Sequence, residues 1–427
     1  MLSLLFASFA THAILQMELT QGLLGATPIA IVPFANNGSL PQLPDVIIAN
    51  DLQNSGRFKV LDRSTLSGFP QDAREVSGSS FKKLGADYAV FGKVNALDNG
   101  QYRISFQLVD LLKGSNQEAI VLQRVYTVSA NNARAAAHHI SDLIYQYVTG
   151  IKGVFSTKLA YVVVTPTGPG KARYTLEVSD QDGYNPRVLL TSNEPIMSPS
   201  WSPNGRSLAY VSFEKRHAAI FVQDIATASR RLLTDYPGIN GAPAWSPDGR
   251  KLALVLSKSG SPNIYVMDVA SKQLTAITRD FNINTEPSWS PNGSKLLFTS
   301  NRGGNPQIYQ VSASGHGSPE RISFNGDYNA RAAYTPDGNH VAMMHRVSGI
   351  YRIGILDLDS GTMRVLGSSP GDSSSPSVAP NGSMILHDTV YRGHNVLAMV
   401  SSDGRVQLVL PARNGAAQDP AWSPFLT

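Results

Sequence analysis

Cysteine is absent from this chain of 427 residues, so disulfides, thiolate metal ligands and cysteine nucleophiles are excluded. Charge is also sparse, because only 16% of the residues are charged and the net charge is +5. No basic run is denser than Lys215-Arg216, which is too dilute to indicate a nucleic-acid partner. No stretch reaches the ~18 apolar residues of a membrane-spanning helix, so we expect the mature protein to be soluble. Apolar residues make up 42% of the chain, and its length predicts two or more domains or one large repeat array.

The first segment, residues 1–13, is apolar, lacks Asp, Glu, Lys and Arg, and ends in small residues. This composition is typical of the back half of a secretory signal. We therefore expect residues 1–13 to be a partial or truncated signal peptide. An ordinary buried strand or helix is the alternative.

A unit of an aromatic residue, Ser, Pro, Asp or Asn, and Gly recurs with small variations every 44 or 45 residues. All four tryptophans of the chain occupy its first position. Pro presets one turn position and Gly accepts a positive φ, so each unit predicts a tight turn between two strands. The units begin at Trp201, Trp245, Trp289, Tyr334, Val378 and Trp422.

Each repeat contains short apolar strands separated by Gly, Pro, Asn and Asp turns, which is the pattern of a four-stranded antiparallel meander. Repeats of this length indicate a β-propeller. Six third strands are recognisable, and they contain Leu176, Ile220, Ile264, Ile308, Ile353 and Val396. The first repeat lacks a turn unit before it, and the unit at Trp422 lacks strands after it. We therefore expect an all-β six-bladed propeller that the carboxy-terminal strand closes, with a linear solenoid as the alternative.

The region before the repeats has a different pattern. Strand signals are expected at residues 28–34, 58–61, 88–94, 102–109 and 119–128. One helix is expected from about Asp45 to a stop at Gly56, and another from Asn132 to Gly150. The sequence thus predicts an α/β domain at 14–152 followed by the propeller at 153–427.

The residues just before each turn unit begin the innermost strand of a blade, so six such segments converge on one mouth of the central channel. Their residues are mostly small, which leaves the mouth open to a loop or a peptide of a partner. A solvated rim without a ligand is the alternative. The polar contacts expected at this mouth are Asn240, Asn284, Thr285, Glu286 and Arg331.

Catalytic patterns are weak, and we expect neither enzymatic activity nor a cofactor or metal. A peptidase of the prolyl-oligopeptidase type would need a hydrolase domain, and none follows Thr427. A metal-dependent six-bladed hydrolase would need carboxylates in the channel, but the available ones stand at positions that we interpret as non-equivalent between blades. These are Glu194, Glu286, Asp372 and Asp419. Four other aspartates recur at one phase of the third strand and predict a repeated turn hydrogen bond, namely Asp180, Asp224, Asp268 and Asp357.

Segments in both predicted domains resemble the TolB family, the soluble propeller proteins of the Tol-Pal system of Gram-negative bacteria. The resemblance covers nearly the whole mature chain and extends beyond the propeller repeat. The similar segments are residues 50–58, 61–63, 107–110, 143–153, 160–163, 179–185, 240–243, 265–268, 284–287 and 420–424.

The resemblance implies a non-enzymatic, periplasmic protein that binds the lipoprotein Pal at one face of the propeller. It also implies that an amino-terminal peptide binds TolA, with a joint role in outer-membrane integrity and envelope constriction at cell division. Carried over by motif, the Pal contacts are Asn240, Gly241, Ala242, Asn284, Thr285 and Glu286, and the mouth residue Arg331 is added to them. Family members commonly have His where this chain has Ile239. Other outer-membrane lipoproteins or porins are further partners to consider, and a monomer is expected outside the complex.

The TolA-binding peptide maps to the segment before Pro28. Apolar and polar residues alternate there with the spacing of a strand, which suits docking in the first domain or pairing with another protein. The residues expected to bind TolA are Ile14, Leu15, Gln16, Met17, Glu18 and Leu19.

Overall fold

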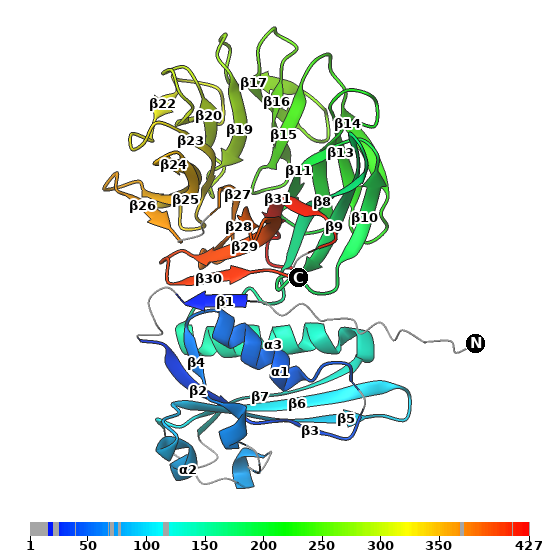
Figure 1. The fold of residues 1–427 in the computed structure, drawn as a ribbon, viewed down its shortest axis with the longest axis vertical. Helices are drawn as coiled ribbons and strands as arrows, with labels where there is room; N and C mark the ends of the chain where they lie inside the picture. Colours follow the sequence, from blue (N-terminus) through cyan, green and yellow to red (C-terminus); the bar gives the residue numbers. More distant parts are fainter. Residues whose placement is uncertain are drawn as a thin grey trace, which may run out of the picture.

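The computed structural model describes residues 16–19, 25–38, 40–66, 68, 72–75, 78–113, 119–367, 371–411 and 413–426. The expected signal peptide, Ile14 and Leu15 lie outside these residues. An amino-terminal α/β region packs below a β-propeller (Figure 1). Within the described part of the chain, no helix is long and apolar enough to cross a membrane.

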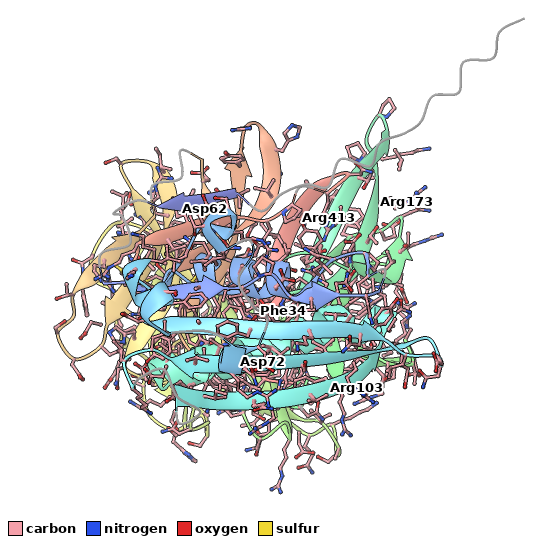
Figure 2. All side chains as sticks on the ribbon, turned by 90° about the horizontal axis from the view of Figure 1, so that it is seen from below. Phe34, Asp62, Asp72, Arg103, Arg173 and Arg413 are labelled. Atoms are coloured by element: carbon pink, nitrogen blue, oxygen red, sulfur yellow. The ribbon has the colours of Figure 1, made fainter. Side chains whose placement is uncertain are left out.

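The amino-terminal region is built on one mixed sheet. The strand Thr27–Ile31 runs parallel to both of its neighbours, and the short strand Ala35–Asn36 is also parallel to its partner, whereas the two remaining pairs are antiparallel. Figure 2 shows this sheet from below, with the propeller blades behind it. The strand order is β4 (Phe58–Val60), β2 (Thr27–Ile31), β5 (Tyr88–Ala96), β6 (Gln101–Asp110) and β7 (Ile120–Ser129), with β3 (Ala35–Asn36) paired to β5.

Two helices, α1 (Pro44–Asn54) and α3 (Ala133–Thr149), lie between this sheet and the propeller (Figure 1). Pro44 begins α1 at a position where no backbone donor is needed, and Gly150 ends α3 with φ of 73°. The apolar faces of both helices pack on the sheet, where Leu52 and Ile140 are fully buried. The predicted strands and helices are confirmed, although the first strand ends at Ile31 rather than residue 34.

The short helix α2 (Gly78–Lys83) was not predicted. It packs with the 3-10 turn Arg63–Leu66 against a second, smaller core that contains Phe81 and Phe91. Two further 3-10 turns span Ala73–Glu75 and Ala130–Asn132. Because these elements are short, they carry too few periodic positions to be recognised in the sequence.

Six antiparallel blades of four strands form the propeller, as predicted. From the channel outward, the first blade is β31 (Ala416–Trp422), β8 (Lys158–Gly168), β9 (Lys171–Asp180) and β10 (Arg187–Ser192), and the second is β11 (Ile196–Trp201), β12 (Ser207–Ser212), β13 (Ala219–Asp224) and β14 (Arg230–Thr234). The third is β15 (Asn240–Trp245), β16 (Lys251–Leu256), β17 (Asn263–Asp268) and β18 (Leu274–Ala276), and the fourth is β19 (Asn284–Trp289), β20 (Lys295–Ser300), β21 (Gln307–Ser312) and β22 (Glu320–Arg321). The fifth is β23 (Asn329–Tyr334), β24 (His340–Val347), β25 (Ile350–Asp357) and β26 (Met363–Leu366), and the sixth is β27 (Ser373–Val378), β28 (Met384–Tyr391), β29 (His394–Ser401) and β30 (Val406–Val409).

The carboxy-terminal strand β31 pairs with β8 and completes the first blade, so the predicted closure of the ring is confirmed. Trp422 reinforces the closure, because its indole Nε1 donates to Thr157 Oγ1 at 2.8 Å. Ser423 Oγ accepts from the backbone N–H of Lys158 at 2.9 Å. Residues from the two ends of the propeller sequence therefore hold the ring together.

The amino-terminal strand β1 (Gln16–Leu19) adds a fifth strand to the sixth blade. It pairs antiparallel with β30, with Gln16 opposite Val409 and Leu19 opposite Val406. The predicted strand is confirmed, but of the two alternatives for its use, docking in the first domain is wrong because the strand lies on the propeller. Pairing with another protein stays a prediction. The outermost strand of a blade leaves backbone donors and acceptors unpaired, and β1 covers those of β30.

Candidate partner-binding site

The channel is shaped by a repeated irregularity in the innermost strands. In every blade the pairing register shifts at the residue three positions before the aromatic of the turn unit. That residue has a positive φ, between 45° and 55°, although it is never glycine. Such a bulge turns its side chain in a new direction. The six bulge residues, all of which line the channel, are Ser198, Ala242, Glu286, Arg331, Ser375 and Asp419.

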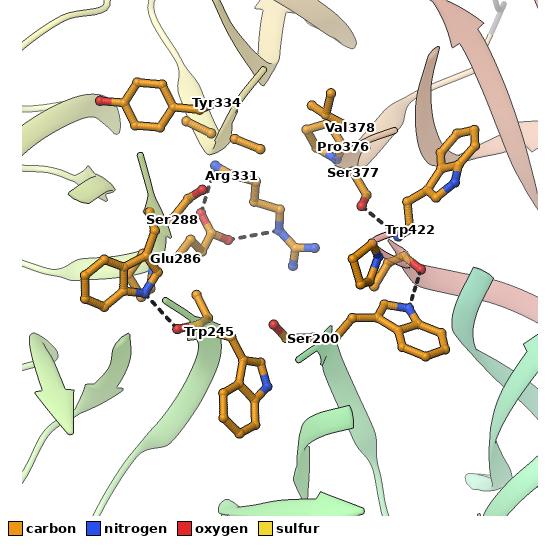
Figure 3. A pocket seen from close by; sticks show the side chains of 18 of the residues that line it. Ser200, Trp245, Glu286, Ser288, Arg331, Tyr334, Pro376, Ser377, Val378 and Trp422 are labelled. Atoms are coloured by element: carbon orange, nitrogen blue, oxygen red, sulfur yellow. Dashed lines mark hydrogen bonds and ion pairs between the residues drawn. The ribbon is translucent and has the colours of Figure 1, made fainter. Parts of the chain in front are cut away.

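Arg331 crosses this ring of bulge residues and joins it into one network (Figure 3). Its Nε lies 2.9 Å from Glu286 Oε1, and its Nη1 lies 3.0 Å from Asp419 Oδ1 and also donates to Ser375 Oγ. Burial opposes the charge of the guanidinium, but Asp419 and Glu286 outweigh burial and raise the pKa of Arg331 above its usual value. The ring is therefore a fixed ion network across blades 1, 4, 5 and 6.

Two carboxylates that the sequence analysis placed at non-equivalent positions are in fact equivalent. Glu286 and Asp419 both stand three residues before a tryptophan and line the channel. The other two of the four carboxylates, Glu194 and Asp372, lie outside the channel lining. Counting back from the turn unit would have revealed this. Since Arg331 pairs with both Glu286 and Asp419, the carboxylates neutralise a cation of the chain itself and do not form an open set of metal ligands.

The channel is a cavity of about 530 Å³. From the bulge residues towards the turn units, the channel is lined by small side chains and then by the prolines of the turn units. The tryptophans pack between blades, as Trp289 Nε1 donates to the carbonyl of Ala244 at 2.9 Å in the neighbouring blade. Figure 3 shows Trp245 and Trp422 beside the channel. The indole of the turn unit thus bridges neighbouring blades.

We call the end of the channel where the innermost strands begin the amino mouth. Asn240 and Asn284 stand at the first position of their strands and are fully buried. Asn240 Oδ1 accepts from the N–H of Tyr236 at 3.0 Å, and Asn284 Oδ1 accepts from Arg302 Nη2 at 2.9 Å. Both asparagines thus hold the loops of the mouth, and their side chains are not accessible to a partner.

Three large apolar side chains are exposed at the amino mouth. Ile239 and Ile283, the residues before the two asparagines, are 46% and 52% exposed. Their backbone N–H groups are fixed by Ser257 Oγ at 2.7 Å and Asn301 Oδ1 at 2.8 Å. Phe281, in the loop that leads to β19, is 99% exposed. Exposed apolar groups held in fixed positions are typical of protein–protein interfaces.

The remaining mouth residues lie between these loops and the ring of bulge residues. Gly241, Ala242, Thr285 and Glu286 are partly exposed. Thr285 follows the buried Asn284 in β19, next to Glu286, whose Oε2 accepts from Thr299 Oγ1 at 2.8 Å. The structure thus brings the sequence-selected residues of both motifs to one mouth. It adds the apolar residues Ile239, Ile283 and Phe281, of which only Ile239 drew notice in the sequence.

Three side chains of types that can bind metals lie together within the described ranges, outside the channel. They are Asp51, His138 and Asp182, whose ligand atoms lie within 4.8 Å of one another. The two carboxylates face opposite nitrogens of the imidazole, with Asp51 at Nδ1 and Asp182 at Nε2. The guanidinium of Arg134 contacts the Asp182 oxygen that would be the ligand. This arrangement suits a protonated imidazole better than a metal ion.

Comparisons with known families agree with the two-part architecture. The model for the TolB beta propeller domain matches residues 145–426, and the model for the TolB amino-terminal domain matches residues 15–117. The chain belongs to the TolB family. It is 50% identical over 417 residues to the Tol-Pal system protein TolB of Hamiltonella defensa, which covers 97% of this chain and 96% of the relative.

Other TolB proteins give the same result. The Tol-Pal system protein TolB of Xanthomonas campestris pv. campestris is 49% identical over 425 residues, covering 99% of this chain and 95% of the relative. The crystal structure of TolB from Acinetobacter baumannii superposes with a TM-score of 0.85 at 38% identity, covering 96% of this chain and 100% of that one. The chain is therefore a TolB protein of the Tol-Pal system in both sequence and fold.

Proposed function

We propose that this chain is a non-enzymatic scaffold of the periplasm that binds Pal at the amino mouth of the propeller and TolA through its amino-terminal strand. In this role it supports outer-membrane integrity and envelope constriction at cell division. The observation that carries the proposal is the exposed apolar rim of Ile239, Ile283 and Phe281 around a channel that Arg331 crosses. Membership of the TolB family supports the choice of partners.

The rim suits a protein surface better than a small molecule. Its apolar side chains lie outside the channel, while Glu286 and Asp419 inside it are already paired with Arg331. Small residues at Gly241 and Ala242 let a partner approach the backbone closely. The buried asparagines contribute by fixing the loops, and the direct contacts are assigned to Gly241, Ala242, Thr285, Glu286 and Arg331 together with the apolar rim.

The proposal is tested by adding bulk and charge at the mouth. Thr285→Arg and Ala242→Arg are each expected to weaken Pal binding at least about thirtyfold, the equivalent of a loss of ~2 kcal/mol, as at a central interface position. Thr275→Arg in β18 and Ala226→Arg in the turn after β13 introduce the same side chain at exposed positions outside the channel lining. Isothermal titration calorimetry with purified Pal measures all four variants.

Unchanged Pal affinity in both mouth variants would remove this face from consideration. Equal losses in the mouth variants and in the Thr275 and Ala226 controls would indicate a general effect of added charge. Circular dichroism melting of each variant shows whether the propeller has stayed folded.

The amino-terminal strand supports the TolA part of the proposal. Its contact with β30 consists of a four-residue backbone pairing, from Gln16 to Leu19. Backbone pairing of this kind can be exchanged for pairing with another sheet, whatever the side chains are. The segment can therefore bind a partner through the same backbone groups that pair with β30 on the propeller.

A further inference from the structure

A buried cluster of charged side chains joins the amino-terminal domain to the first propeller blade, away from the channel. Arg134 of α3 lies with its Nε 3.0 Å from Asp180 Oδ2, and its Nη2 contacts Asp182 in the loop after β9. Lys158 of β8 pairs with the other oxygen of Asp180. Arg134, His138 and Asp142 are four residues apart on α3, so they form one stripe along the face of the helix that meets the propeller.

His138 occupies the centre of this stripe, and its side chain is only 3% exposed. Its Nδ1 lies 2.8 Å from Asp51 Oδ2 on α1. Its Nε2 is buried, has no hydrogen-bond partner among the described residues, and lies 3.9 Å from Asp182 Oδ2 of the propeller. A protonated imidazole would therefore bridge a carboxylate of one domain and a carboxylate of the other.

A protonated imidazole adds a third cation to the buried cluster, beside Arg134 and Lys158. Asp182 also contacts Arg134, but a neutral imidazole leaves Asp51 without a cationic partner among the described residues, and the Asp51 and Asp182 oxygens lie within 4.8 Å of each other. Like charges at this distance repel strongly in a buried site. The titratable and charged groups that face His138 are Asp51 on α1, Arg134 and Asp142 on α3, Lys158 on β8, Asp180 at the end of β9, and Asp182 and Tyr184 in the following loop.

We propose that His138 is a pH-sensitive latch between the two domains, whose protonated imidazole fastens α1 and α3 to the first propeller blade. Loss of that proton separates Asp51 from Asp182 and loosens the domain interface. The latch is independent of the amino mouth, because none of its residues lines the channel.

The direction of the pH dependence follows from the electrostatics. Burial opposes protonation of His138, but the charge and hydrogen bond of Asp51, together with Asp182, outweigh burial and raise its pKa above the ordinary value of 6.5. In the closed form the domains are fastened by the latch, and in the open form the interface is loosened. Because the pKa of His138 is higher in the closed form, the stabilisation of the closed form by the latch is complete below the pKa of the open form. This stabilisation is lost as the pH rises through the pKa of the closed form. Between these two values, the equilibrium constant for opening rises by up to about tenfold per pH unit.

The experiment measures the distance between the domains directly. Because the chain has no cysteine, Asp98→Cys in the amino-terminal domain and Ala226→Cys in the propeller give two unique spin-label sites, both exposed. Pulsed electron spin resonance is expected to give one narrow distance distribution at about pH 6 and a broader one at about pH 9. His138→Gln should give the same broad distribution at both pH values.

His139→Gln is the matched control, because His139 is the next residue on α3 but is exposed and packs edge-on against Tyr126. The distance distribution of this variant should change with pH as it does in the unaltered protein. A distribution that does not change with pH in the unaltered protein would overturn the proposal, and so would an unchanged pH course in His138→Gln. If His138→Gln does not fold, the nuclear magnetic resonance titration of the His138 ring in the unaltered chain decides, since a pKa at or below 6.5 also contradicts the latch.

Discussion

The six bulge residues show how one backbone position gives the channel its chemistry. Each has the same positive φ and the same place in its blade, yet their side chains range from the methyl group of Ala242 to the guanidinium of Arg331. The bulge is a property of the strand pairing and tolerates these differences. Substitution at this position can therefore alter the charge of the channel without altering the blade.

Removing the cation from this network is expected to be costly. In Arg331→Gln, Glu286 and Asp419 lose their ion pairs, so the free energy of unfolding should fall by about 1–3 kcal/mol, less than for a fully buried pair because the side chain of Arg331 is 33% exposed. Asp419→Asn in the same chain should recover part of this loss, since one uncompensated charge is gone. Urea denaturation of the two single variants and the double variant measures this coupling. Strictly additive losses would contradict the network.

The sequence predicted side-chain contacts correctly where the interacting residues are close together in the chain. Asp224, Asp268 and Asp357 accept backbone N–H groups in the turn that follows their strand, as predicted. Asp180 occupies the same phase, but its carboxylate binds Arg134 and Lys158 instead. The turn is encoded by neighbouring residues, whereas Arg134 stands 46 residues away and reaches Asp180 only because the two domains pack together.

At the scale of single elements, β1 stands at the edge of its blade. It pairs with β30 alone, whereas β30 also pairs with β29. The alternation of residues 15–20 predicted a strand, but nothing in it identified the edge to which the strand is paired. Edge strands accept any extended segment of suitable length, so the choice depends on where the folded domains place the segment.

Deletion of residues 14–22 tests the role of this strand. Binding to TolA should be lost, while binding to Pal should remain within about threefold, because the propeller keeps its own four strands in every blade. Amide hydrogen exchange at Val406–Val409 should become faster at the uncovered edge. Pull-down with TolA and calorimetry with Pal report the two partners separately. Retained TolA binding would show that the contact lies elsewhere in the amino-terminal domain.

At the scale of the whole molecule, the ring is closed by residues that are far apart in the sequence. Lys158 and Ser423 exchange hydrogen bonds across 265 positions, and β31 supplies the innermost strand of a blade whose other strands precede all the turn units. The unmatched unit at Trp422, together with the first repeat that lacks a unit, predicted this closure. The contact between the two domains was beyond prediction, because the stripe on α3 has no repeat or motif that points to its partners.

Truncation tests whether closure stabilises all six blades or only the first. Removing residues 420–427 deletes Trp422, which is 6% exposed in the core between the first and sixth blades. Loss of a buried tryptophan alone costs about 3–5 kcal/mol, and the opened ring also exposes two sheet edges that favour aggregation. We expect a lower Tm and lower solubility than in a control that lacks only residues 425–427 and so retains Trp422 and Ser423. Because neighbouring blades share their cores, the melting transition should shift as a whole rather than split into two. A truncated chain with the Tm and solubility of the control would mean that each blade is stabilised by its neighbours alone and that closure contributes little.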